Sequence, residues 1–182
     1  MKSIGTVAKS YLQRVRQNHA LEHATINLLS RRYPGAQVVG FSSPAGFTLY
    51  SSLTTEDIIL AARQALSALQ AGESELAVHE NCGTNLVITA ALTTLATVVG
   101  FGAGHLGLGR RRSSRSGFLE SLERLPQAVL LNAIALVVAN PIARWVQSRV
   151  TTDPDASQLE ISSIFTDYYG TLQRVRVHTR RV

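Results

Sequence analysis

The sequence predicts an α+β protein built from a small helix–hairpin–helix domain, a two-helix transmembrane hairpin and a short C-terminal β segment. Three observations predict this fold class. Residues 7–30 and 55–71 repeat apolar side chains every three or four positions, which is the period of an amphipathic helix. Residues 86–104 and 125–143 are apolar runs without a charged side chain, each long enough to cross a bilayer. Residues 159–179 contain two segments with the composition and alternation of strands.

The first predicted helix, residues 7–30, presents one continuous face at spacings of three and four. The positions on this face are Tyr11, Val15, His19, Glu22, His23, Ile26 and Leu29. The sequence Tyr33-Pro34-Gly35 ends the helix, because neither proline nor glycine continues it well. Three polar side chains therefore fall on a face that is otherwise apolar, where we expect them to be buried.

A β-hairpin is predicted next, with strands at residues 37–41 and 47–52 that are rich in β-branched and aromatic side chains. The Ser-Pro-Ala-Gly sequence between them places proline second and glycine fourth, which favours a tight turn. Thr54 is placed to cap a second helix, and Gly72 ends it. We expect the strands near the C-terminus to join this hairpin in one small sheet.

The two apolar runs predict a membrane hairpin. Residues 81–109 contain no Asp, Glu, Lys or Arg, and a span of about 20 apolar residues crosses the ~30 Å hydrocarbon core of a bilayer. The alternative is that both runs are buried helices of a soluble domain, but the short charged loop between them favours the membrane. Gly100 and Gly104 form a small-xxx-small pair that lets a neighbouring helix approach closely, so a homo-oligomer is one expected assembly.

Two signals bear on the orientation of this hairpin, and they conflict. Arg110, Arg111, Arg112 and Arg115 in the connecting loop favour a cytoplasmic tip. The chain opens without a secretory signal peptide, which favours cytoplasmic ends. We expect a multi-pass protein of the bacterial cell membrane with both termini in the cytoplasm. A re-entrant hairpin is the alternative that removes the conflict.

Composition excludes some classes of function. The formal net charge of +6 is spread along the chain, and aromatic residues make up only 6% of it, with none in the arginine cluster. Nucleic-acid binding is therefore not expected. The single cysteine, Cys82, excludes an intrachain disulfide. The expected domains are a cytoplasmic helix–hairpin–helix domain with the metal motif (residues 1–80), the membrane hairpin (81–150), and C-terminal strands that pack on the first domain (151–182).

The strongest chemical signal is the H-x-x-E-H sequence formed by His19, Glu22 and His23. On a helix the two histidines lie one turn apart on the same face, where two imidazoles can hold one metal ion. Glu22 lies beside them and can accept a proton from a water molecule that the metal activates. This spacing is that of the inverzincin metalloprotease motif. The alternative is that the histidines form a buried hydrogen-bond network without a metal.

A second block, His79-Glu80-Asn81-Cys82-Gly83-Thr84-Asn85, precedes the first apolar run. His79 and Cys82 are three positions apart, so both could reach one ion. Cys82 is alternatively a small buried hydrophobe, the usual state of a lone cysteine. Asn81, Thr84 and Asn85 are candidates to cap the first membrane helix or to hold a metal ligand in place.

The two blocks together, residues 18–25 and 79–85, resemble a bacterial membrane family that is catalogued as a domain of unknown function, over roughly residues 11–105. They are also similar to a second membrane family, described as metal-dependent enzymes, which pairs H-x-x-E-H-[KA] with H-x-x-C-G-T. The matching positions are His19, Glu22, His23, His79, Cys82, Gly83 and Thr84. The resemblance implies a shared metal site and does not supply a reaction.

Two functions are consistent with these signals. The first is a membrane-bound zinc-dependent hydrolase, of which a peptidase is one form, with Zn²⁺ on His19, His23 and His79 and with Glu22 as general base. The second is a non-catalytic membrane scaffold or assembly protein whose structural metal site Cys82 closes as fourth ligand. A catalytic zinc site has three protein ligands and a water, whereas a structural site has four protein ligands. The lipid bilayer is the expected partner, and the sequence does not identify a substrate.

Overall fold

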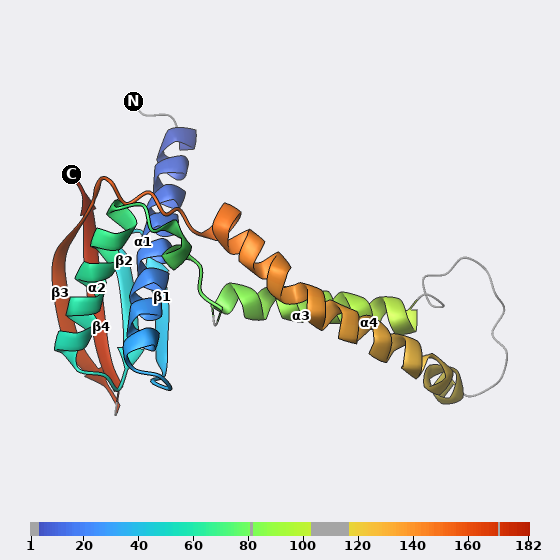
Figure 1. Cartoon of the computed structure of the whole chain (residues 1–182). Helices are drawn as coiled ribbons and strands as arrows, with labels where there is room; N and C mark the ends of the chain where they lie inside the picture. The colour runs from blue at the N-terminus through green and yellow to red at the C-terminus, as the bar shows by residue number, and fades with distance from the viewer. Residues whose placement is uncertain (1–3, 81, 103–116, 171) are drawn as a thin grey trace. The chain divides into compact units, whose positions relative to one another are not determined.

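The computed structural model describes residues 4–80, 82–102, 117–170 and 172–182 (Figure 1). The chain divides into two compact units. The first comprises Met1–His79 and Val146–Val182, and the second comprises Glu80–Trp145. The first unit combines helices with an antiparallel sheet and the second is helical, so the predicted α+β fold class is confirmed.

In the part of the chain that the structure describes, the first unit contains two long helices, two short helical turns and four strands. In chain order they are α1 (Ile4–Arg32), β1 (Val38–Ser43), β2 (Gly46–Ser51), α2 (Thr55–Gln70), the 3₁₀ turn η1 (Ser74–Ala77), the π-helical turn η2 (Gln147–Thr151), β3 (Leu159–Tyr169) and β4 (Leu172–Arg181). The predicted helices and strands are all present, and their ends differ from the predicted ones by a few residues.

The four strands form one antiparallel sheet in the order β1-β2-β4-β3. β4 pairs with β2, which places Val175 opposite Leu49 and Val177 opposite Phe47. All four of these side chains are buried, and they share one face of the sheet because side chains alternate along a strand. The C-terminal strands therefore complete the sheet that the β1–β2 hairpin begins, as the sequence predicts.

α1 and α2 cover this buried face of the sheet (Figure 1). The helices and the sheet share one hydrophobic core. Its residues come from both helices, from η1 and from three of the strands. They include Ala20, Leu21, Ala24 and Leu29 of α1, Ile58, Ala61, Ala62 and Ala65 of α2, Leu76 of η1, and Phe47, Leu49, Val175 and Val177 of the sheet. The small alanines let the helices pack closely, so α1 is firmly held on the sheet.

The start of α2 is capped as the sequence predicts. The Thr54 hydroxyl oxygen accepts a hydrogen bond from the backbone N–H of Asp57 at 3.2 Å and donates to its carboxylate at 2.7 Å. The Tyr33 hydroxyl also donates to Asp57, at 2.5 Å. Hydrogen bonds from Tyr33 and Thr54 lower the pKa of the Asp57 carboxyl. A carboxylate at this position also suits the positive end of the helix.

The second unit is a helical hairpin of α3 (Gly83–Gly102) and α4 (Gly117–Val146). The last residue of α4, Val146, is counted with the first unit. The two helices are antiparallel, because Gly100 lies against Ala128 while Thr97, one turn earlier, bonds Asn132, one turn later. A Cβ atom added at Gly100 would come within 2.8 Å of the Ala128 Cβ. Gly100 is therefore used within the chain to bring α3 and α4 together, and Gly104 lies outside the described residues.

The apolar side chains of this hairpin are exposed. Leu86, Val87 and Val137 retain 73%, 68% and 76% of their accessible surface, and both helices are long and apolar enough to cross a membrane. Core helices of a soluble domain would instead bury these side chains. α4 continues through Pro141 to Val146, and prolines within helices are better tolerated in membrane spans than in soluble proteins. The arginine cluster of residues 110–115 lies outside the part of the chain that the structure describes.

Candidate metal centre

α1 brings His19 and His23 together on one face. The centroids of the two rings are 4.2 Å apart, with an angle of 62° between their planes. This follows from their separation of four positions, which is about one helical turn. His23 is only 1% exposed, whereas His19 is half-buried. The predicted placement of both imidazoles on a largely buried face of the helix is therefore present in the structure.

Both rings are oriented by backbone carbonyl groups. His19 Nδ1 lies 3.0 Å from the Thr151 carbonyl oxygen, and His23 Nδ1 lies 2.8 Å from the Ala77 carbonyl oxygen. A carbonyl oxygen only accepts hydrogen bonds, so Nδ1 carries the proton on each ring. In the neutral imidazole the lone pair is then on Nε2. Metal-binding histidines are commonly held in this way, with one nitrogen donating to an acceptor and the other binding the ion.

His23 Nε2 has no hydrogen-bond partner among the residues that the structure describes, and it is buried. A buried polar atom without a partner costs about 1–3 kcal/mol. The Nε2 lone pair can accept a hydrogen bond or bind a metal ion. The rings of His19 and His79 both neighbour the ring that carries this atom.

His79 adds a third imidazole from a different part of the first unit. Its ring centroid lies 6.0 Å from that of His23, with an angle of 47° between the planes. The segment before it is fixed to α1 by the Asn27 side-chain amide, which donates to the carbonyl oxygens of Leu76 and Val78 at 2.9 Å each. The backbone N–H of His79 donates to Gln147 Oε1 at 3.0 Å. These contacts set where the His79 ring can lie.

Glu22 is also buried, with 5% of its surface exposed. Its carboxylate accepts a hydrogen bond from the Ser42 hydroxyl of β1. The Glu22 side chain packs so closely on Gly40 that a Cβ atom there would approach Oε1 to 2.3 Å. The sheet therefore anchors the carboxylate of the H-x-x-E-H motif, and glycine at position 40 provides the space for it.

The remaining candidate residues belong to the second unit, at the start of α3. The Cys82 sulfur accepts a hydrogen bond from the Thr84 N–H at 3.4 Å, and the Cys82 carbonyl oxygen accepts one from the Asn85 N–H at 2.9 Å. The Asn85 side chain donates to the Glu80 carbonyl oxygen. Cys82 thus caps this helix, and it follows His79 by three positions in the sequence. Asn81 lies outside the described residues.

Sequence reasoning did not find five residues that position these side chains, namely Asn27, Ser42, Ala77, Gln147 and Thr151. One of them had a usable signal, because Asn27 follows His23 by four positions and continues the polar stripe of α1. Ala77 and Thr151 act through their backbone carbonyls, which leave no signature in the sequence. Ser42 and Gln147 are brought to the site only by the tertiary fold.

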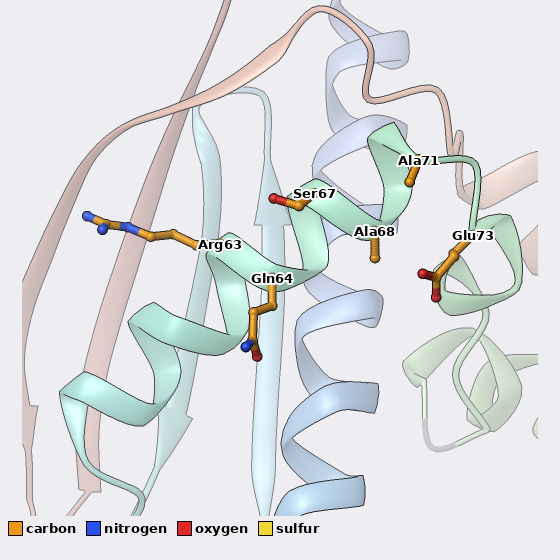
Figure 2. Close-up of a pocket in the computed structure, with 6 residues that line it drawn as sticks. All are labelled: Arg63, Gln64, Ser67, Ala68, Ala71 and Glu73. Carbon is orange, nitrogen blue, oxygen red and sulfur yellow. The ribbon is translucent and has the colours of Figure 1, made fainter.

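A surface hollow elsewhere in the first unit is not this centre. Figure 2 shows its lining side chains along α2 and the turn after it: Arg63, Gln64, Ser67, Ala68, Ala71 and Glu73. None of them is a histidine or cysteine, and the set lacks the ligand types that transition metals prefer. The histidine cluster is therefore the feature of the described residues with the clearest chemistry.

Fold and site together define a class of protein in which an α+β unit with a partly buried histidine cluster is joined to two apolar helices that could span a membrane. Within this class, the chain belongs to the family described as Domain of unknown function (DUF6391), whose profile matches residues 14–164. That match includes both sequence blocks, β1, β2 and the start of β3, and it bears out the expectation of a family of unknown function.

One curated relative is an uncharacterised protein of Picosynechococcus sp., which is 39% identical over 88 residues. The alignment covers 43% of this chain and 43% of the relative, so the chain spans less than half of that protein's length. No solved structure matches the chain closely enough for comparison.

Proposed function

We propose that this protein is a membrane-anchored metalloprotein in which His19, His23 and His79 hold a Zn²⁺ or similar divalent ion. The observation that carries the proposal is the buried Nε2 atom of His23, which bears a lone pair and has no hydrogen-bond partner among the described residues. The rings of His19 and His79 lie beside the His23 ring, with centroids 4.2 and 6.0 Å from its own. Imidazole nitrogen is a preferred ligand of zinc.

The reaction class that best fits this ligand set is hydrolysis, with a peptidase as one form. Three histidine ligands would leave one coordination position open for a water molecule, whose proton the ion makes easier to remove. Glu22 is the residue of this chain that would take that proton, since it is the carboxylate within the H-x-x-E-H motif. Its hydrogen bond from Ser42 anchors this carboxylate to β1.

A structural metal site is the second candidate, and one observation favours it. His23 Nε2 is sealed from solvent, and the two α1 histidines bind carbonyl oxygens of η1 and η2, so an ion here would tie three segments together. Cys82 would then be the fourth ligand that closes the site, as its place three residues after His79 allows. In this case the protein acts as a membrane scaffold or assembly factor.

Two substitutions separate these functions. Glu22→Gln keeps the shape of the side chain but removes the base. In the hydrolase, metal content should stay close to the parent value while activity, in a cellular complementation assay, falls by roughly 10²–10⁴-fold. In the structural protein, Cys82→Ser should release the metal and Glu22→Gln should retain full cellular function. The hydrolase proposal is wrong if this second pair of results is obtained.

A further inference from the structure

We infer that Gln147 is a positioning residue of the metal centre and that the π-helical turn η2 sets the spacing between His19 and His79. This inference rests on the proposed metal function. It concerns a residue that is far from both motifs in the sequence and that becomes relevant only through the contacts of the fold. Its role is to place a ligand rather than to bind the ion.

The contact between Gln147 and His79 is the first part of the argument. The Gln147 side chain is fully buried, and its Oε1 accepts the backbone N–H of His79 at 3.0 Å. His79 lies after η1 and before α3, in neither a helix nor a strand, so regular secondary structure does not fix its backbone. The amide of Gln147 therefore defines the point from which the His79 ring projects.

The other end of the same turn holds His19, through the 3.0 Å contact between its Nδ1 and the Thr151 carbonyl oxygen. The turn itself is closed by Thr152, whose N–H and hydroxyl both donate to the Gln147 carbonyl oxygen, at 3.0 and 2.8 Å. Arg16 of α1 braces it by donating to the carbonyl oxygens of Arg149 and Thr152. One rigid five-residue turn thus contacts two of the three proposed ligands.

The π-helical geometry has a consequence for this spacing. A π turn holds one more residue than an α turn, and such turns occur often at functional sites. In η2 the Gln147 side chain contacts His79 while the Thr151 carbonyl contacts His19, so two groups of one turn reach different histidines. A regular α-helical turn at this position would not present both groups in the same directions.

The test compares zinc affinity and the visible spectrum of the Co²⁺-substituted protein, using full-length protein in detergent. Gln147→Met keeps the length of the side chain but removes the acceptor. We expect zinc affinity to fall by ~10–100-fold, as is usual when a ligand loses its supporting contact, and the Co²⁺ absorption bands to shift. Gln147→Glu keeps an acceptor oxygen and should restore both. If Gln147→Met does not fold, Gln147→Asn, whose acceptor is withdrawn by one methylene, should show the same weakening.

Gln17→Met is the matched control. Gln17 is another buried glutamine of the first unit; it donates to the Asp155 carbonyl oxygen at 2.7 Å and accepts from Arg181 at 3.2 Å. It should lose stability but keep the parent's zinc affinity and Co²⁺ spectrum. The inference is overturned if Gln147→Met binds zinc as tightly as the parent with an unchanged spectrum. If the parent itself binds no metal, the proposed function fails and this inference fails with it.

Discussion

The imidazole of His23 is held at one nitrogen by a backbone carbonyl and keeps the other buried beside two more histidine rings. The H-x-x-E-H spacing predicts that His19 and His23 share a helical face, and the structure brings their rings together. The sequence could not predict which groups orient the rings. Ala77 and Thr151 act through carbonyl oxygens, and every residue has one, so only the fold selects them.

Gly40 provides a residue-scale prediction about Glu22. Gly40→Ala should destabilise the protein by about 1–3 kcal/mol, the usual cost of forcing extra volume into a packed site, because the new Cβ would overlap the buried Glu22 side chain. Chemical unfolding in detergent measures this loss. The Glu22→Ala variant supplies the space, so Gly40→Ala should cost much less in that background. Equal costs in the two backgrounds would show that the close contact does not matter.

Individual helices and strands follow closely from local sequence patterns. Thr54 caps α2 as expected, and the β1–β2 hairpin turns at the predicted residues. The order of strands was harder to predict, since the sequence indicates only that the C-terminal strands join the hairpin. β4 lies between β2 and β3 because Val175 and Val177 complete the buried face that Phe47 and Leu49 begin. Such matching of faces depends on tertiary packing.

The contact between α3 and α4 gives a prediction at the scale of elements. Gly100→Ala should lower the thermal unfolding midpoint in detergent, because its Cβ would meet the Ala128 backbone at 2.7 Å and push the helices apart. Gly102→Ala is the matched control, as the nearest atom there is a Val98 methyl carbon at 3.6 Å. Midpoints that agree for the two variants would contradict the proposed packing.

At the scale of the whole molecule, the α+β unit is formed by residues from both ends of the chain, with the apolar hairpin inserted between them. The length of the two apolar runs and their lack of charged residues are sufficient to predict two helices of membrane-spanning length, because a segment that crosses the hydrocarbon core must be predominantly apolar. Orientation does not follow from these two features, because it depends on the charges that flank the helices, and the arginine cluster of residues 110–115 lies outside the described residues.

The exposed apolar surface of α3 and α4 predicts membrane integration. The protein should remain in the membrane pellet after an alkaline carbonate wash and should need detergent for release, because burial in lipid removes this surface from water. Fractionation followed by immunoblotting measures this directly. Recovery of the protein as a soluble monomer would show that the helices pack in some other way.

The metal content of the purified protein tests the central claim most directly. Detergent-purified parent protein should carry about one Zn²⁺ or similar ion per chain by elemental analysis, as a site with two helical histidines and a further ligand predicts. His23→Ala should lose the metal. His178→Ala should keep it, because His178 of β4 packs against Phe165 at a centroid distance of 5.4 Å and belongs to no group of possible metal ligands among the described residues. A parent protein without metal, or a His23→Ala variant with the parent's metal content, would contradict the account.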